Sequence, residues 1–352
     1  MKIIKYLLFL ILLIVIGGAI YFGTQDGSYD IKDSMVIKAP PEVVFNKVND
    51  YRNWETWGPW KKEDPTIRFT YAEKTAGEGA SYSWDGEMNG SMKTTKVIPN
   101  KEIEQDLTLE TPGGARHPKV FWSFEEVPEG TNITWRMKGE HTLLDKFFFS
   151  ISGTDFKAQV HEMNITGLEG IAKEVVEDMK KYSINVDGLT QYGGGYYMYT
   201  TSVARMQELG DKMEPMMTQV LDFVSNNNLN MSGKPFTLYN QVDEANNTVI
   251  FSTGVPVREK VITPEGSPVV CGFMEPISAV KISLKGNYNH LPEAYTKGNE
   301  YIKKNGLEID PEGKKFEVYI TDPNETANPA NWVTEVYIPI ITTPKPDLEE
   351  GI

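Results

Sequence analysis

The sequence has very little cysteine and histidine, and these shortages exclude several classes of site. Its 352 residues include one cysteine, Cys271, so an intrachain disulfide framework is excluded. The four histidines, His117, His141, His161 and His290, are scattered and lack the spacing that is typical of zinc ligands. We therefore expect no metal and no other cofactor.

Positive charge is also scarce. The chain has 35 lysines and arginines against 49 acidic residues, a net charge of −14, and no long basic run. Because neutralising phosphates requires clustered lysine and arginine, this balance argues against a nucleic-acid partner. The length, with 40% hydrophobic and 11% aromatic residues, suffices for two domains with cores of their own.

One long apolar run lies near the N-terminus. Residues 6–22 carry no charge, and 17 helical residues span about 26 Å, near the lower limit for a bilayer core of about 30 Å. Lys2 and Lys5 precede the run, whereas Asp26 and Asp30 follow it. By the positive-inside rule, the N-terminus is expected in the cytoplasm and the rest of the chain outside it.

Two interpretations of the run are open, an uncleaved transmembrane anchor over residues 1–25 and a cleaved signal peptide. Its apolar core is longer than a typical signal-peptide core, and no small-x-small cleavage site follows cleanly, which favours the anchor. No cysteine near residue 20 would carry a lipid. The prediction is a single-pass membrane protein with extracytoplasmic globular domains, periplasmic in a Gram-negative cell.

Residues 33–183 predict an α+β domain. A short strand and a helix that starts at a proline pair come first, and apolar residues at helical spacing over 168–179 predict a long closing helix. Between them, turn residues separate six strand-like segments: Ile67–Tyr71, Ala80–Trp84, Ser91–Ile98, Glu102–Leu109, Lys119–Glu126 and Thr131–Lys138.

Several motifs of this half carry a resemblance to a known family: Ile37-x-Ala39-Pro40, Trp54-x-x-Trp57-x-Pro59-Trp60, Gly77-x-Gly79, Trp84 with Gly86, and Gly130-Thr131-x-Ile133-x-Trp135. With them, this half resembles the polyketide-cyclase-like branch of the START-like (SRPBCC) superfamily. That resemblance implies a helix-grip fold, in which an antiparallel sheet wraps a long C-terminal helix and leaves an apolar cavity for lipids or other hydrophobic molecules. The superfamily includes transport, binding and enzymatic members, so it assigns no chemistry.

Aromatic residues are the candidates for lining this cavity. We select Trp57, Trp84, Phe121 and Trp135, while aromatics at such positions also commonly fill a core. The apolar segment Phe147-Phe148-Phe149 has three open interpretations: a cavity lid, a contact with the membrane surface, or packing under the helix.

The second half contains a duplicated unit. The segment Gly233-Lys234-Pro235-Phe236-Thr237-Leu238-Tyr239 is echoed by Gly313-Lys314-Lys315-Phe316-Glu317-Val318-Tyr319. Each copy predicts a β-α-β-β order within a domain over 196–341. A glycine-rich stretch suggests a linker over 184–195, and proline and acidic residues suggest a disordered tail over 342–352.

The second copy contains the motifs that carry a further resemblance: Gly286-Asn287-Tyr288, Leu291-x-x-Ala294-Tyr295, Tyr301-Ile302, Phe316-Glu317-Val318-Tyr319 with Asp322-Pro323, and Trp332-x-Thr334-Glu335-Val336-x-Ile338-Pro339. With them, the duplicated half resembles the GyrI-like small-molecule-binding family, the effector-binding domain of AraC-type regulators. This resemblance implies a cleft at the pseudo-twofold axis, lined by aromatics and holding an acidic residue that favours cationic or amphipathic ligands.

The differences between the copies select a site. Glu317 aligns with Thr237, and Glu335 aligns with Ser252, whereas the aromatics at 316 and 319 recur at 236 and 239 and are interpreted as requirements of the fold. We select Glu317 as a tentative catalytic residue, with Tyr288, Tyr301, Tyr319, Trp332 and Glu335 as further ligand-binding candidates. A solvated carboxylate on an exposed sheet face is the competing interpretation of Glu317.

Three functions follow as hypotheses. The first is a membrane-anchored protein that binds hydrophobic or amphipathic, including cationic, small molecules, with one cavity in each domain. The second is a hydrolase of electrophilic small molecules, such as the cyclopropane-type substrates of some relatives, with Glu317 as base or nucleophile. The third is a protein-interaction or regulatory module, although no helix-turn-helix segment is evident in the sequence.

Overall fold

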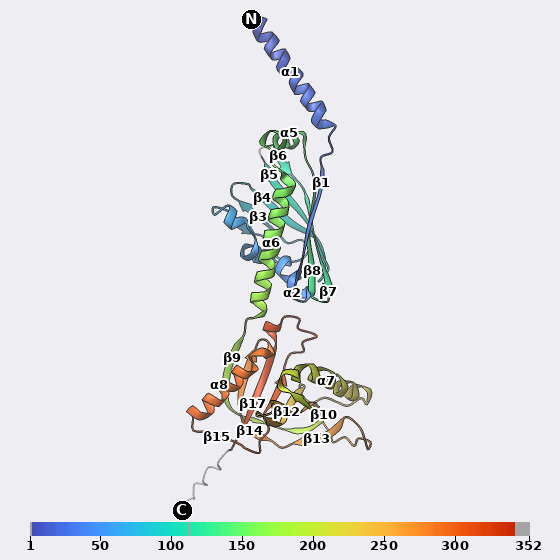
Figure 1. The fold of residues 1–352 in the computed structure, drawn as a ribbon, viewed down its shortest axis with the longest axis vertical. Helices are drawn as coiled ribbons and strands as arrows, with labels where there is room; N and C mark the ends of the chain where they lie inside the picture. Colours follow the sequence, from blue (N-terminus) through green and yellow to red (C-terminus); the bar gives the residue numbers. More distant parts are fainter. Residues whose placement is uncertain (1, 112, 342–352) are drawn as a thin grey trace, which may run out of the picture. The chain divides into compact units, whose positions relative to one another are not determined.

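The computed structural model describes residues 2–111 and 113–341. The chain divides into two compact units, Met1–Asp178 and Met179–Ile352 (Figure 1). The α+β class predicted from the sequence is confirmed: an apolar helix comes first, and each unit contains one large antiparallel sheet with helices. The tail predicted over 342–352 lies outside the described residues.

The first helix, α1 (Lys2–Gly23), contains the long apolar run. From Ile3 to Gly23 its mean hydropathy is 2.7 and none of it is buried in the protein. By length and composition it is suited to crossing a membrane, as the sequence predicts.

The first unit is built on an eight-stranded antiparallel sheet in the order β1-β8-β7-β5-β4-β3-β2, with β6 paired to β5. The longest helix of this unit, α6, lies along the sheet (Figure 1). Its buried side chains include Val160, Leu168, Ile171 and Val175. This is the helix-grip arrangement expected from the sequence. Its strands are β1 (Ser28–Ile37), β2 (Arg68–Tyr71), β3 (Ser81–Asp85), β4 (Gly90–Ile98), β5 (Glu102–Thr111), β6 (Gly114–Arg116), β7 (Lys119–Val127) and β8 (Gly130–Glu140), and its α-helices are α2 (Pro41–Asn49), α3 (Trp54–Trp57), α4 (Trp60–Glu63), α5 (Leu143–Ser152) and α6 (Phe156–Met179).

A glycine allows α3 to approach α6 closely. A Cβ atom added at Gly170 in α6 would lie 2.1 Å from the carbonyl oxygen of Trp57, a backbone atom that cannot turn away. Glycine inside a helix normally lowers helix stability by about 1 kcal/mol relative to alanine. The close contact between α3 and α6 therefore requires a residue that is unfavourable for the helix itself.

Gly170→Ala is therefore expected to destabilise the first unit by about 2 kcal/mol, because overpacking outweighs the gain in helix propensity. The control is Gly210→Ala in α7 (Leu209–Asn226), where an added Cβ meets nothing within 4 Å and a small stabilisation is expected. Urea unfolding of the two variants measures both effects. Stabilisation by Gly170→Ala would contradict the close contact between α3 and α6.

The second unit contains a nine-stranded sheet in the order β13-β10-β12-β11-β16-β17-β14-β9, with β15 paired to β17. Copy one is β10-α7-β11-β12 and copy two is β14-α8-β16-β17, so the expected duplication is present. Its strands are β9 (Ser183–Tyr192), β10 (Gly195–Arg205), β11 (Phe236–Asp243), β12 (Thr248–Pro256), β13 (Val270–Met274), β14 (Ile277–Lys285), β15 (Glu308–Ile309), β16 (Phe316–Tyr319) and β17 (Val333–Ile341), and its α-helices are α7 (Leu209–Asn226) and α8 (Leu291–Lys304).

The stretch 184–195 is structured, which corrects its assignment as a linker. Most of it belongs to β9, which pairs with β14 along the register Ser183↔Lys285 to Tyr192↔Ile277. Ile184 and Val186 alternate with polar residues at the start of β9, but Gly188 and the glycines at 193–195 make the stretch resemble a linker. Pairing with β14 makes this segment a strand despite its glycine.

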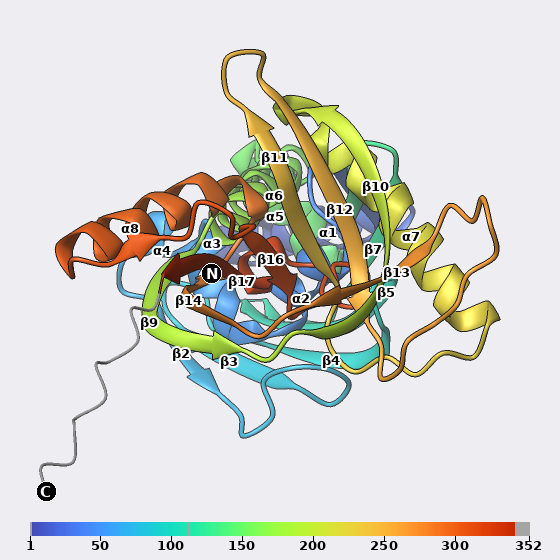
Figure 2. The same ribbon diagram turned by 90° about the horizontal axis from the view of Figure 1, so that it is seen from below.

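The two copies meet at the centre of the sheet, where β11 and β16 run antiparallel. Helix α7 packs on β10 and β12, and α8 packs on β14 and β9. Figure 2 shows α7 and α8 on either side of these central strands. The duplicated halves thus place their junction between the two helices.

Candidate functional site

Glu317 lies at the junction of the two copies. In the register of the sheet it faces Thr237 on β11 and Val336 on β17. Residues directly opposite each other on paired strands share a face, and Val336 belongs to the core beneath α8, so Glu317 also points to the helix side. The two residues that align in the sequence repeat are therefore neighbours in space.

Three tyrosines surround the Glu317 carboxylate. Tyr239 and Tyr295 donate hydroxyl hydrogen bonds to Oε1 at 2.9 and 3.0 Å, and the hydroxyl of Tyr319 lies 3.1 Å from Oε2. They come from β11, α8 and β16, so both copies contribute. Helix α7 contributes Met213, whose sulfur lies 3.1 Å from the Tyr319 hydroxyl.

The carboxylate of Glu317 is buried without a cation. The side chain is 1% exposed, and no ion pair of the described residues includes it. Burial raises the pKa of Glu317 above its usual value, and the hydrogen bonds from the three tyrosines oppose that rise. Burial, followed by the neighbouring carboxylate, raises the pKa of Tyr239, Tyr295 and Tyr319 well above the usual value, which keeps the phenols protonated as donors.

Further aromatic rings extend from this cluster. The ring of Tyr288 lies 5.6 Å from that of Tyr319 and 4.8 Å from that of Trp332, measured between centroids. Burial raises the pKa of Tyr288 to about 12. A positive charge placed here would meet a carboxylate and several aromatic rings, which is the combination that suits a desolvated organic cation.

The structure separates two predicted residues from this cluster. Glu335 faces Val318 across the strands, on the opposite face from Glu317, and forms an ion pair with Lys281 at 2.6 Å and accepts a hydrogen bond from Tyr337. The Glu335 carboxylate therefore does not belong to the site around Glu317, because adjacent register positions on paired strands point to opposite faces of the sheet. Tyr301 packs in the core beneath α8, with its hydroxyl close to Gly188 on β9.

Sequence reasoning missed three members of the cluster. Tyr239 was interpreted as a requirement of the fold because it matches Tyr319, yet both hydroxyls bind Glu317. Tyr295 belongs to the matching motif Leu291-x-x-Ala294-Tyr295 but is not among the selected candidates, and neither is Met213. The available signal was the repeat itself, since paired tyrosines next to an acid at the centre of a duplicated sheet can both reach it.

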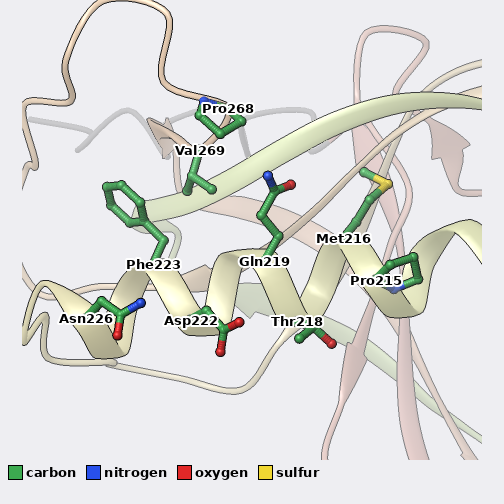
Figure 3. Close-up of a pocket in the computed structure, with 9 residues that line it drawn as sticks. All are labelled: Pro215, Met216, Thr218, Gln219, Asp222, Phe223, Asn226, Pro268 and Val269. Carbon is green, nitrogen blue, oxygen red and sulfur yellow. The ribbon is translucent and has the colours of Figure 1, made fainter.

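A separate groove lies on the outer side of α7 (Figure 3). It has a volume of about 560 Å³, and Asp222 is its one charged lining residue. Its other lining residues are Pro215, Met216, Thr218, Gln219, Phe223 and Asn226 of α7 with Pro268 and Val269. Met216 connects the two places, because it lines the groove and also packs in the cluster of Phe251 with Met213 and Tyr239. The buried charge makes Glu317 the stronger candidate.

In the first unit, the candidate aromatics divide between the two faces of the sheet. Trp57 and Trp135 are each 3% exposed, and their ring centroids lie 6.1 Å apart in the interior. Trp84 packs on Tyr82 at 5.3 Å. The structure corrects the prediction for Phe121, because strand alternation places it on the face opposite to the buried Val120 and Trp122. Trp122 takes the interior position instead and stacks on Trp135, with their ring centroids 4.4 Å apart.

Two buried polar atoms in this interior have no hydrogen-bond partner: Nε1 of Trp135 and Oδ1 of Asn164. The amide of Asn164 donates to Asp33 at 2.9 Å, which fixes its orientation. Unpaired buried polar atoms are costly, so a donor and an acceptor left free here favour an interior that takes up a polar group.

The comparisons with known families agree with this architecture. Residues 29–183 match the family described as polyketide cyclase / dehydrase and lipid transport, and residues 201–341 match the GyrI-like small molecule binding domain. Both resemblances expected from the sequence are thereby confirmed. No curated protein matches the chain.

Solved structures provide further similarities. The EcmrR C-terminal domain is 19% identical with a TM-score of 0.40, and the match covers 46% of this chain and 99% of that one. EcmrR in a DNA complex is 18% identical with a TM-score of 0.39, over 58% and 87% of the two chains. The Aha1 dimer from Colwellia psychrerythraea is 18% identical with a TM-score of 0.31, over 42% and 96%.

Proposed function

Since this chain joins a polyketide-cyclase-like domain to a GyrI-like small-molecule-binding domain, we propose that it is a membrane-anchored binding protein for hydrophobic and amphipathic molecules. The second domain selects a ligand that carries positive charge, and Glu317 recognises that charge. The observation that supports this proposal is that the Glu317 carboxylate is fully buried and accepts hydrogen bonds from three phenols. It has no cationic partner among the described residues.

The missing charge partner supports a cationic ligand. An ionised group in the interior is costly unless it is paired, and three neutral hydrogen-bond donors compensate for only part of that cost. A lipophilic cation would supply the pairing charge while its apolar groups contact Tyr288 and Trp332. Met213, which contacts the Tyr319 hydroxyl, and Met216, which packs in the same cluster, come from α7, and methionine adapts readily to ligands of different shape.

The first domain is proposed to hold the apolar ligand class of its family, with Asn164 and Trp135 available to a polar group of that ligand. Helix α1 is proposed to anchor both domains to a membrane, with the N-terminus in the cytoplasm. The two domains would then present two separate binding sites outside the cytoplasm.

Two probes of nearly equal shape and opposite charge test the proposal for the second domain. The full chain is expected to bind tetraphenylphosphonium at micromolar concentration and to bind tetraphenylborate at least tenfold more weakly, because the buried carboxylate repels the anion. Isothermal titration in detergent measures both affinities. Equal affinities, or tighter binding of the anion, would overturn charge selection at Glu317.

The raised pKa of Glu317 also favours a second function, a hydrolase in which this carboxylate exchanges a proton with the substrate. The tyrosine hydroxyls that contact Glu317 would orient the reacting group. Turnover of a cyclopropane-type electrophile that disappears in Glu317→Gln would support this function. Tight binding without turnover would reject it for the compounds tested.

A further inference from the structure

Helix α5 presents its apolar side to solvent, the reverse of an ordinary surface helix. Leu144, Phe148 and Ile151 are 61%, 62% and 69% exposed, and their spacing places them on one stripe of the helix. Leu143 and Phe147, both about half exposed, widen the same stripe. Contiguous apolar surface of this kind marks a contact with a partner or a membrane.

The inward side of α5 carries the polar contacts that fix it in place. Asp145 caps the helix with Thr142 and forms an ion pair with Arg116 at 2.7 Å. Phe149 turns inward, where its ring lies 5.5 Å from that of Phe156. Helix α5 is thus held firmly with its charged side on the domain and its apolar side outward.

The apolar stripe continues onto α1. The rings of Phe22 and Phe147 lie 5.8 Å apart, and Lys146 donates to the carbonyl oxygen of Phe22 at 3.1 Å in the last turn of α1. Helix α1 is itself exposed along its length and apolar enough to cross a bilayer. Any lipid surface around the end of α1 therefore reaches α5 as well, which identifies the occupant of the stripe.

We propose that α5 is an interfacial membrane helix, embedded at the lipid–water boundary beside the point where α1 leaves the bilayer. This rests on the proposed anchoring by α1 and adds a second, sideways contact. An interfacial helix of this kind buries its apolar face at the level of the headgroups. It would hold the first domain close to the bilayer surface, where lipids and other apolar ligands are concentrated.

Site-directed labels in nanodiscs test the proposal with the full chain. In a Cys271→Ser background, single cysteines at Leu144, Phe148 and Ile151 carry a bimane fluorophore, and the discs contain phosphatidylcholine with or without brominated acyl chains. Glu129→Cys is the control, since this exposed residue lies in the turn between β7 and β8, whereas α5 follows the other end of β8. Quenching at the three α5 positions is expected to exceed that at Glu129 at least threefold.

A label at Ile11→Cys in α1 separates the failure of this inference from the failure of anchoring. If Ile11 is quenched by the lipids and the α5 labels behave like Glu129, α1 spans the membrane and the proposal for α5 is overturned. If neither Ile11 nor α5 is quenched, anchoring itself fails. Shielding of the α5 labels from aqueous iodide without quenching by brominated lipid would show that a protein surface covers the stripe, which also overturns the proposal.

Discussion

A chain carrying Glu317→Gln is expected to bind tetraphenylphosphonium about 100-fold more weakly than the natural protein. The substitution removes the charge and keeps the size of the side chain. The amide oxygen can still accept from Tyr239 and Tyr295, whereas the amide nitrogen cannot accept from Tyr319, whose hydroxyl retains the Met213 sulfur as an acceptor. Loss of one partner of a buried charge pair costs about 3 kcal/mol, which corresponds to this change in Kd. Isothermal titration at neutral pH measures it.

The same interaction predicts how binding depends on pH. The cation requires the ionised form of Glu317, and burial raises the pKa of that carboxyl. Affinity of the natural protein should therefore fall as pH decreases through the raised pKa, and binding near that pH should release a proton. Glu317→Gln should show no such dependence.

Glu335→Gln is the matched control for the binding experiment. It makes the same change of charge in the same copy of the repeat, but on the opposite face of the sheet, where Glu335 pairs with Lys281. Its affinity for the cation should remain within about twofold of the natural value, because the charge is directed away from the ligand. Equal losses in the two variants would indicate a general effect of net charge and contradict a site at Glu317.

Much of the fold could be predicted because the sequence repeats its own pattern. The echo of 233–239 at 313–319 predicts two β-α-β-β copies, and these two segments become the adjacent strands β11 and β16. The prediction failed at β9, where the glycines suggested a linker. Pairing with β14 makes most of this stretch a strand instead. Phe121, the candidate selected from the sequence, lies one position from Trp122, which takes the interior place, and in a strand one position changes the face.

The candidate site could be predicted only in part, because it depends on contacts across the repeat. Glu317 differs between the two copies, and Tyr319 contacts it directly. The ring of Tyr288 packs next to Tyr319, and that of Trp332 packs next to Tyr288. Glu335 broke the symmetry as well, but the register places it on the other face. Tyr295 reaches Glu317 from α8, a contact between a helix and a strand that no spacing along the chain specifies.

Glu317→Gln is also expected to stabilise the second unit at neutral pH, by about 1–2 kcal/mol, the gain typical when a functional residue is replaced by one that suits the fold better. Burial penalises the charged carboxylate, and the neutral amide avoids that penalty. The loss of binding in this variant would therefore not result from unfolding. Urea unfolding of the natural and variant chains, repeated across a range of pH, measures the difference.

The sign of the pH dependence follows from the direction of the pKa shift. The folded protein holds the Glu317 proton more tightly than the unfolded chain does, so the stability of the natural protein falls as pH rises from the ordinary value of 4.5 through the raised pKa. The advantage of Glu317→Gln should vanish below pH 4.5, where Glu317 is neutral in both states, and grow to its full size above the raised pKa. Glu335→Gln, which removes an ion pair with Lys281, should instead lose about 0.5 kcal/mol at neutral pH. A variant at 317 that is less stable than the natural protein at neutral pH would show that the three phenols fully compensate the buried charge, and the argument for a cationic ligand would lose its physical basis.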